Sequence, residues 1–135
     1  MLTAAGKYGT IGRVKASLFI TCLVDQFFPN VGLCMAKVLE RVGVEVEFNP
    51  AQTCCGQPFF NTGYRREAAE VARRFMSVFA DSEYVVAPSG SCTAMVRVFY
   101  QELFKHDEKL ADQAKHLAAR LYELSEFLVN VLKVE

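Results

Sequence analysis

The chain has 135 residues, which suits one domain, and 52% of them are hydrophobic, enough for a core that needs no disulfides. Fifteen basic residues balance fifteen acidic ones, so the chain lacks the basic surface typical of a nucleic-acid-binding protein. No apolar run approaches the roughly 20 residues of a membrane helix, and we expect no transmembrane segment and a cytoplasmic location.

The elements predicted along the chain alternate between strands and helices. Residues 1–16 are expected to form a flexible leader, and 17–135 a single domain. Within that domain the apolar spacing predicts strands over 17–21, 44–48 and 84–87, a loop over 53–63, and helices over 31–42, 64–78, 93–104 and 108–119. This order predicts an α/β fold, a three-layer Rossmann-like open parallel sheet of about four strands with helices on both faces.

The end of the chain has two interpretations. The apolar residues between 110 and 131 recur at a spacing that fits one long helix. They also fit a short fourth strand over 121–124, followed by a helix with Ser125 as its N-cap. The periodicity alone does not decide between them, and the family resemblance described below favours the strand.

Cysteines follow three of the predicted strands. Cys22 comes after the first strand, Cys54 and Cys55 after the second, and Cys92 after the third, at the start of a helix. The carboxyl ends of parallel strands meet at one edge of a sheet, where ligands bind, so we expect these four thiols to converge. Thiolates are soft ligands that prefer zinc, copper(I) and iron–sulfur clusters, and the four cysteines are therefore candidate metal ligands.

The fifth cysteine and the residues next to the other four are expected to have different roles. A buried free cysteine is often only a small apolar side chain, and Cys34 on the apolar stripe of its helix is expected to be such a core residue. Gly56 and Gly90 would let the backbone approach a bulky cofactor, and Gln57 is a candidate donor beside it. The odd number of cysteines excludes complete disulfide pairing.

The motifs CCGQPFFNTGY, TCLVDQFFPNVG, APSGSC and LSEFLV resemble the CCG cysteine-rich domain family of heterodisulfide reductase B-like proteins. Within that family they are most similar to lactate utilization protein A and glycolate oxidase iron–sulfur subunits. The resemblance covers 17–131 and implies an iron–sulfur cluster of the 4Fe-4S type, cubane or non-cubane, held by Cys22, Cys54, Cys55 and Cys92. Members of the family usually carry two such domains, so the resemblance also implies that 17–135 is the N-terminal half of a two-domain protein or pairs with a second chain. It thus implies a second CCG domain, in cis or in trans, and other iron–sulfur or accessory subunits as partners.

One position departs from the full family pattern. That pattern ends in CxxC, whereas this chain has Ser89-Gly90-Ser91-Cys92, which leaves four thiols and makes Ser89 a weak candidate ligand. The type of cluster therefore stays open, and the cluster can be lost from purified protein because exposed clusters are sensitive to oxygen.

Three functions remain open from the sequence. The first is an electron-transfer subunit in the oxidation of L-lactate, or of another 2-hydroxy acid such as glycolate, to the keto acid. The second is a structural zinc domain, since four thiolates can hold zinc. The third is a thiol or heterodisulfide redox catalyst. We assign no catalytic residue, because His106 and His116 lie on polar segments and are expected to be exposed. Whether the chain is itself an enzyme stays undecided.

Two aromatic positions beside the cysteines complete the set of candidates. Tyr64, at the start of the helix that follows the loop, is expected to pack in the core. Phe27 and Phe28, after Cys22, fit either the core or an exposed docking patch.

Overall fold

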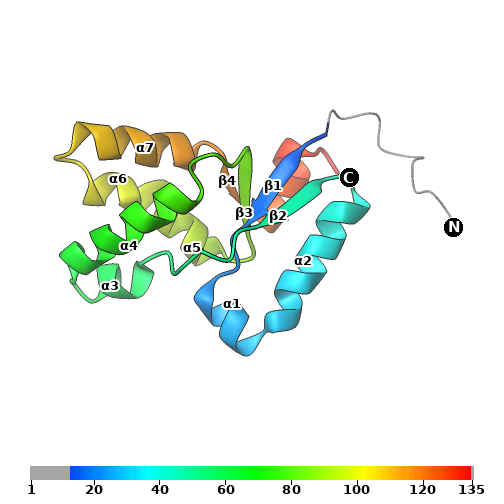
Figure 1. Ribbon diagram of the computed structural model, residues 1–135, viewed down its shortest axis with the longest axis horizontal. Helices are drawn as coiled ribbons and strands as arrows, with labels where there is room; N and C mark the ends of the chain where they lie inside the picture. Colours follow the sequence, from blue (N-terminus) through cyan, green and yellow to red (C-terminus); the bar gives the residue numbers. More distant parts are fainter. Residues whose placement is uncertain (1–12, 135) are drawn as a thin grey trace, which may run out of the picture.

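The computed structural model describes residues 13–134, and its centre is a four-stranded parallel sheet (Figure 1). The strands lie in the order β2-β1-β3-β4. Their bounds are Lys15–Leu18 for β1, Glu45–Phe48 for β2, Tyr84–Ala87 for β3 and Leu121–Glu123 for β4. This confirms the predicted α/β sheet, and β3 spans the predicted residues.

Helices lie on both sides of the sheet, as predicted. After β1 come α1 (Cys22–Phe27) and α2 (Pro29–Arg41), and after β2 come α3 (Gln57–Asn61) and α4 (Arg65–Val78). The helical run after β3 comprises α5 (Gly90–Ala94), the π-helical segment η1 (Met95–Phe99) and α6 (Tyr100–Leu103). It leads to α7 (Glu108–Ala118), and α8 (Leu124–Glu126) with the π-helical segment η2 (Phe127–Val131) follows β4.

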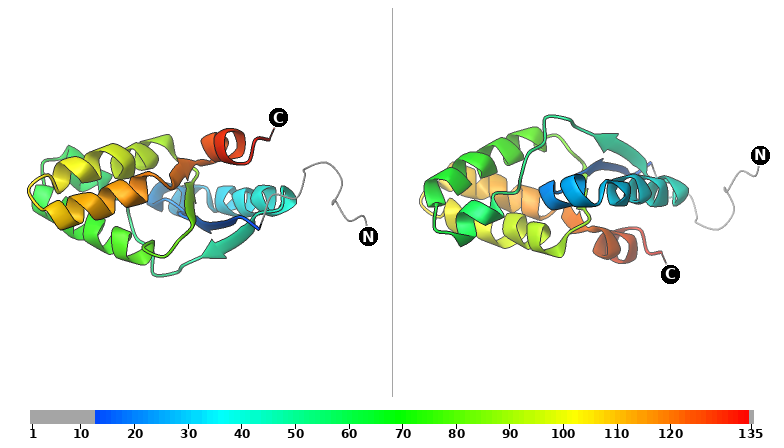
Figure 2. Two further views of the ribbon diagram at one scale, coloured as in Figure 1. Left: turned by 90° about the horizontal axis from the view of Figure 1, so that it is seen from above. Right: turned by 90° about the horizontal axis from the view of Figure 1, so that it is seen from below.

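Two apolar clusters cover the two faces of the sheet. On β3, Val85 and Ala87 belong to one cluster and Val86 to the other, as the alternation of side chains along a strand requires. The larger cluster joins α4, η1, α6 and α7, which Figures 1 and 2 show gathered at one end of the molecule. The smaller cluster contains Met35 and Leu39 of α2 and Phe127 of η2.

Several sequence predictions were wrong at the boundaries. β1 begins at Lys15, inside the segment predicted as a leader, and residues 1–12 of that segment lie outside the described residues. The loop predicted over 53–63 contains α3, and α1 was not predicted at all. The last helix is capped by the carboxylate of Glu123, which accepts from the N–H of Ser125 at 2.8 Å, so Ser125 is not the cap.

Two predictions of burial were also wrong. Cys34 is exposed, because the buried stripe of α2 runs through Gly32, Met35 and Leu39. Tyr64, predicted to pack in the core, precedes α4 and is 58% exposed.

Candidate metal centre

The loops after β1, β2 and β3 bring four cysteines together at the carboxyl edge of the sheet. The Sγ atoms of Cys22 and Cys54 lie 3.8 Å apart. The thiol of Cys55 lies within hydrogen-bonding reach of both Cys54 and Cys92. The sequence is therefore sufficient to place these four thiols in one group, as the topology of parallel strands requires.

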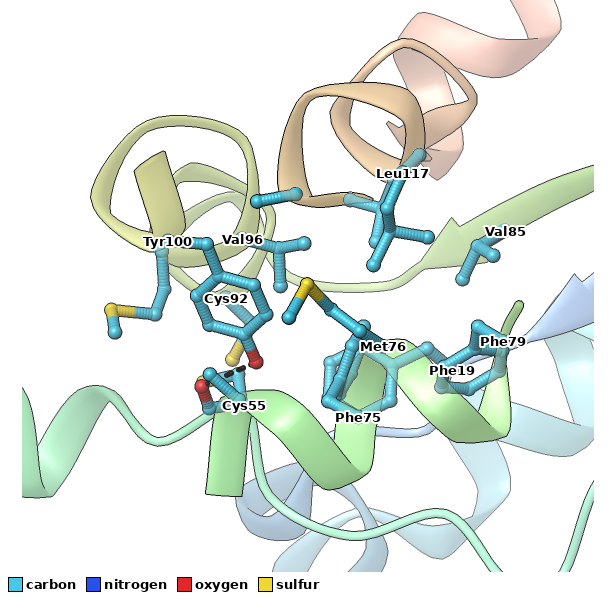
Figure 3. Packing of buried hydrophobic residues seen from close by; sticks show 14 of the residues in the cluster. Phe19, Cys55, Phe75, Met76, Phe79, Val85, Cys92, Val96, Tyr100 and Leu117 are labelled. Atoms are coloured by element: carbon cyan, nitrogen blue, oxygen red, sulfur yellow. Dashed lines mark hydrogen bonds between the residues drawn. The ribbon is translucent and has the colours of Figure 1, made fainter. Parts of the chain in front are cut away.

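The four thiols differ in their exposure to solvent. Cys55 and Cys92 are buried, Cys54 is half-buried and Cys22 is exposed on α1. Figure 3 shows Cys55 and Cys92 close to Tyr100 at the end of the larger apolar cluster. The phenol of Tyr100 donates a hydrogen bond to the carbonyl oxygen of Cys55 at 2.8 Å, which connects the cysteine loop to α6 (Figure 3).

Hydrogen bonds lower the pKa of two of the four thiols. The pKa of Cys54 is lowered to about 5, first by a hydrogen bond from Cys55 and then by the backbone N–H of Gly56. That N–H lies 3.4 Å from the Cys54 sulfur. The pKa of Cys92 is lowered to about 6, first by Cys55 and then by the hydroxyls of Ser89 and Ser91. Both thiols are therefore more acidic than an ordinary cysteine.

The other two cysteines keep their protons. The pKa of Cys55 is raised, first by side-chain hydrogen bonding with Cys54 and then with Cys92, and also by burial of the side chain. The pKa of Cys22 is raised first by burial and then by the negative charge of Cys54. A metal binds thiolates, so any metal taken up here displaces the protons of Cys22 and Cys55.

The glycines predicted beside the site have unequal roles. Gly56 has φ +87°, and a Cβ there would lie 3.4 Å from the carbonyl oxygen of Ala68, so both conformation and space favour glycine. At Gly90 a Cβ would meet nothing within 4 Å, and the structure gives no packing reason for glycine. The backbone N–H of Gln57 interacts with the sulfur of Cys55, so this residue acts through its main chain.

Ser89, the weak candidate ligand, is the N-cap of α5. Its Oγ accepts from the backbone N–H of Cys92 at 3.4 Å and lies 3.3 Å from the hydroxyl of Ser91. It therefore stands beside Cys92 as a hydrogen-bonding partner. The two histidines, His106 and His116, are exposed and lie on the segment that contains α7, away from the cysteines.

The four thiols match the geometry of a single zinc ion only in part. In a tetrahedral zinc site with Zn–S distances of about 2.3 Å, each pair of sulfurs is about 3.8 Å apart. The Cys22–Cys54 distance of 3.8 Å fits one such edge. Within residues 13–134, however, no three His, Cys, Asp or Glu side chains are spaced to hold one metal ion. The arrangement thus offers four grouped thiols without the compact tetrahedron of a single ion.

Sequence reasoning missed two side chains that hold this site. One is Tyr100, described above, and the other is Gln52, whose side chain bonds to the backbone of Leu18 and Ile20 at the end of β1. Both lie outside the cysteine motifs, and a tyrosine or glutamine in an apolar or loop segment carries no signal of its partner.

The family assignment follows from comparison with known proteins. Residues 16–97 match the family model described as CCG, cysteine-rich domain. The chain belongs to the CCG cysteine-rich domain family. This confirms the resemblance seen in the sequence, and Cys22, Cys54, Cys55 and Cys92 all lie within the matched residues.

The chain is similar over most of its length to curated proteins. The chain is 55% identical over 122 residues to lactate utilization protein A of Bacillus subtilis, which covers 90% of the chain and 51% of that protein. It is 52% identical to lactate utilization protein A of Geobacillus thermodenitrificans, with the same coverage. The chain thus spans about half the length of these relatives. No solved structure matches it.

Proposed function

We propose that this CCG domain binds an iron–sulfur cluster through Cys22, Cys54, Cys55 and Cys92 and serves as an electron-transfer subunit in lactate utilization. The observation that carries the proposal is the grouping of four thiols from three strand ends at one edge of the sheet. The substrate would be L-lactate or another 2-hydroxy acid such as glycolate, oxidised to its keto acid. The name and identity of the curated relatives support this choice.

The spacing of the thiols supports a cluster over a single zinc ion. The four thiols would share the several iron atoms of a cluster, so their sulfurs need not form the compact tetrahedron that one ion requires. When bound, such a cluster takes up and releases single electrons. Four thiols with Ser89 in place of a fifth leave both the cubane and the non-cubane 4Fe-4S forms within the proposal.

The surrounding groups would adjust the properties of the sulfurs. The N–H groups of Gly56 and Gln57 point to Cys54 and Cys55, and the hydroxyls of Ser89 and Ser91 to Cys92. Hydrogen bonds to ligand sulfur stabilise negative charge and raise the reduction potential of a cluster. Since the two histidines are exposed and remote, the proposal assigns substrate deprotonation to another subunit.

The partner in this proposal is a second cysteine-rich domain, in cis or in trans, together with other iron–sulfur or accessory subunits. The chain spans about half the length of its curated relatives, so a comparable length of protein accompanies this domain in them. α1 presents exposed apolar side chains beside Cys22, with Phe27 70% and Leu23 66% exposed. Apolar side chains of this size gather on surfaces that bind another protein, and we propose α1 as the face that meets the second domain.

No helix in residues 13–134 is long and apolar enough to cross a membrane. The cytoplasmic location expected from the sequence stays a prediction.

Anaerobic reconstitution with iron and sulfide tests the cluster. We expect the wild-type protein to bind about four irons and four sulfides, with a visible absorption band and a paramagnetic resonance signal that separates cubane from non-cubane forms. Cys54→Ser should lose most of this iron, because it removes one of the four grouped thiols, the one whose sulfur lies 3.8 Å from that of Cys22.

Cys34→Ser is the matched control, since Cys34 is exposed on α2 and lies outside the group of four thiols. Its iron content should equal that of the wild type. The proposal fails if the wild-type protein takes up no iron, or if Cys54→Ser binds as much as Cys34→Ser. One tightly bound zinc with no affinity for iron would instead establish the zinc domain.

A further inference from the structure

Gln52 makes three hydrogen bonds to the main chain between the first two cysteine loops. Its Oε1 accepts from the backbone N–H of Ile20 at 2.8 Å. Its Nε2 donates to the carbonyl oxygen of Leu18 at 3.0 Å and to that of Asn49 at 2.9 Å. One side-chain amide therefore connects the end of β1 to the turn that follows β2.

The place of these bonds in the chain matters for the site. Ile20 is two residues before Cys22, and Gln52 is two residues before Cys54, so the amide connects the two segments whose cysteine sulfurs lie 3.8 Å apart. β1 and β2 pair through Leu18 and Phe48, where the strand register ends. Beyond that point, the bonds of Gln52 to Leu18 and Ile20 continue the connection between these two segments toward the sulfurs.

The exposure of this side of the site makes such a connection necessary. α1, which begins at Cys22, has no buried residue that would fix it by packing. Gln52, Cys22 and Cys54 line a cavity of about 240 Å³, so space remains open between the two loops. The buried Phe19 and Thr21 fix the chain just before Cys22, and the hydrogen bonds of the half-buried Gln52 amide join that segment to the loop that carries Cys54.

We infer that Gln52 is a positioning residue for the thiol site, which sets the separation of the Cys22 and Cys54 sulfurs. It does not touch the sulfurs or a cofactor, and it acts through the backbone of the two loops. The inference concerns the site on which the proposed function rests, but it is a statement about the metal-free protein. It therefore stands or falls independently of which metal the thiols bind.

Disulfide formation between Cys22 and Cys54 in the metal-free protein measures this separation. Oxidised glutathione accepts two electrons and two protons from the two thiols and is released as two glutathione thiols, while one S–S bond forms in the protein. The rate of the Cys22–Cys54 cross-link is followed by mass spectrometry of peptides. In the same samples, the alkylation rate of the buried Cys92 reports on general loosening of the fold.

Gln52→Ala should slow the cross-link by at least about tenfold, because small losses of alignment are costly for reactions between held groups. The alkylation rate of Cys92 should stay at the wild-type value. Gln113→Ala, an exposed glutamine on α7, is the matched control and should change neither rate. If Gln52→Ala does not fold, Gln52→Met carries the same expectation, since it keeps the length of the side chain and removes the three bonds.

Two results would overturn the inference. One is a cross-linking rate in the Gln52 variant that equals the wild-type rate. The other is a parallel change in cross-linking and in Cys92 alkylation, which would make Gln52 a residue of general stability only. If the wild-type protein binds no iron but Gln52→Ala slows the cross-link as predicted, the proposed function fails and the positioning role stands.

Discussion

The cysteine site has a buried side and an exposed side, and they are built differently. Cys55 and Cys92 are 2% and 9% exposed, and they lie beside the fully buried Tyr100 at the end of the larger apolar cluster. Cys22 is exposed on α1, where no residue is buried. Cys55 and Cys92 are thus fixed by the core, against which Cys54 also packs, whereas Cys22 has no such support on its helix.

This difference indicates where the metal-free protein is ordered. Segments with few buried apolar contacts open at low free energy, so α1 should open far more often than η1 or α6. Because metal binding and folding of the ligand segments are coupled, a bound metal would add most order at α1. We therefore expect Cys55 and Cys92 to keep their positions and Cys22 to move toward them when a metal binds.

The largest expected effect is loss of the core behind the buried pair. Phe75 is fully buried, with ring centroids 4.7 Å from those of Phe19 and Phe79 and 5.8 Å from that of Tyr100. Phe75→Ala should lower the free energy of unfolding by about 3–5 kcal/mol, because it removes apolar contacts and leaves a cavity. Urea unfolding of the metal-free protein measures this change.

Phe28→Ala is the control for the exposed side, since Phe28 is 64% exposed. Its free energy of unfolding should differ little from the wild type. Equal losses in the two variants would contradict the division into a buried and an exposed side.

A smaller effect is expected at the hydrogen bond that joins the cysteine loop to α6. Tyr100→Phe keeps the ring and removes the hydroxyl that donates to the carbonyl oxygen of Cys55. The free energy of unfolding should fall by about 1–3 kcal/mol, the cost of a buried acceptor left without a donor. Tyr64→Phe, at a position that is 58% exposed, is the matched control and should be close to neutral. Unchanged urea unfolding of Tyr100→Phe would show that this bond contributes nothing to the buried side.

The sequence predicted the elements best where one face is apolar and the ends are marked. β3 is a short apolar run that ends before Pro88, and both of its bounds were correct. β1 starts earlier than predicted because the charged Lys15 is accommodated in the strand, with its Nζ 3.3 Å from Glu45 and 3.1 Å from Glu47. Such a cross-strand pair is invisible until the register of the strands is known.

The exposed side was harder to predict for a physical reason. α1 has only six residues, too few for an apolar pattern to recur over several turns, and such recurrence is the signal that predicts a helix. α3 begins next to Pro58, a residue that marks a loop in the sequence yet suits the first turn of a helix. The grouping of the cysteines needed only strand order, whereas the bonds of Gln52 and Tyr100 depend on distances between segments far apart in the chain.

The smallest expected effect on stability lies on α1 itself. Phe27 is 70% exposed, so Phe27→Ser should change the free energy of unfolding of the isolated chain by no more than about 0.5 kcal/mol. The same change should weaken association with a second domain, because it removes a large apolar side chain from the proposed contact face. Co-purification with a tagged form of the unmatched part of the Bacillus subtilis relative measures that association. Arg74→Ser, an exposed position on α4, is the control and should leave both quantities unchanged. A loss of more than 1 kcal/mol in the isolated chain would mean that α1 is already packed, and unchanged co-purification would mean that the second domain binds elsewhere.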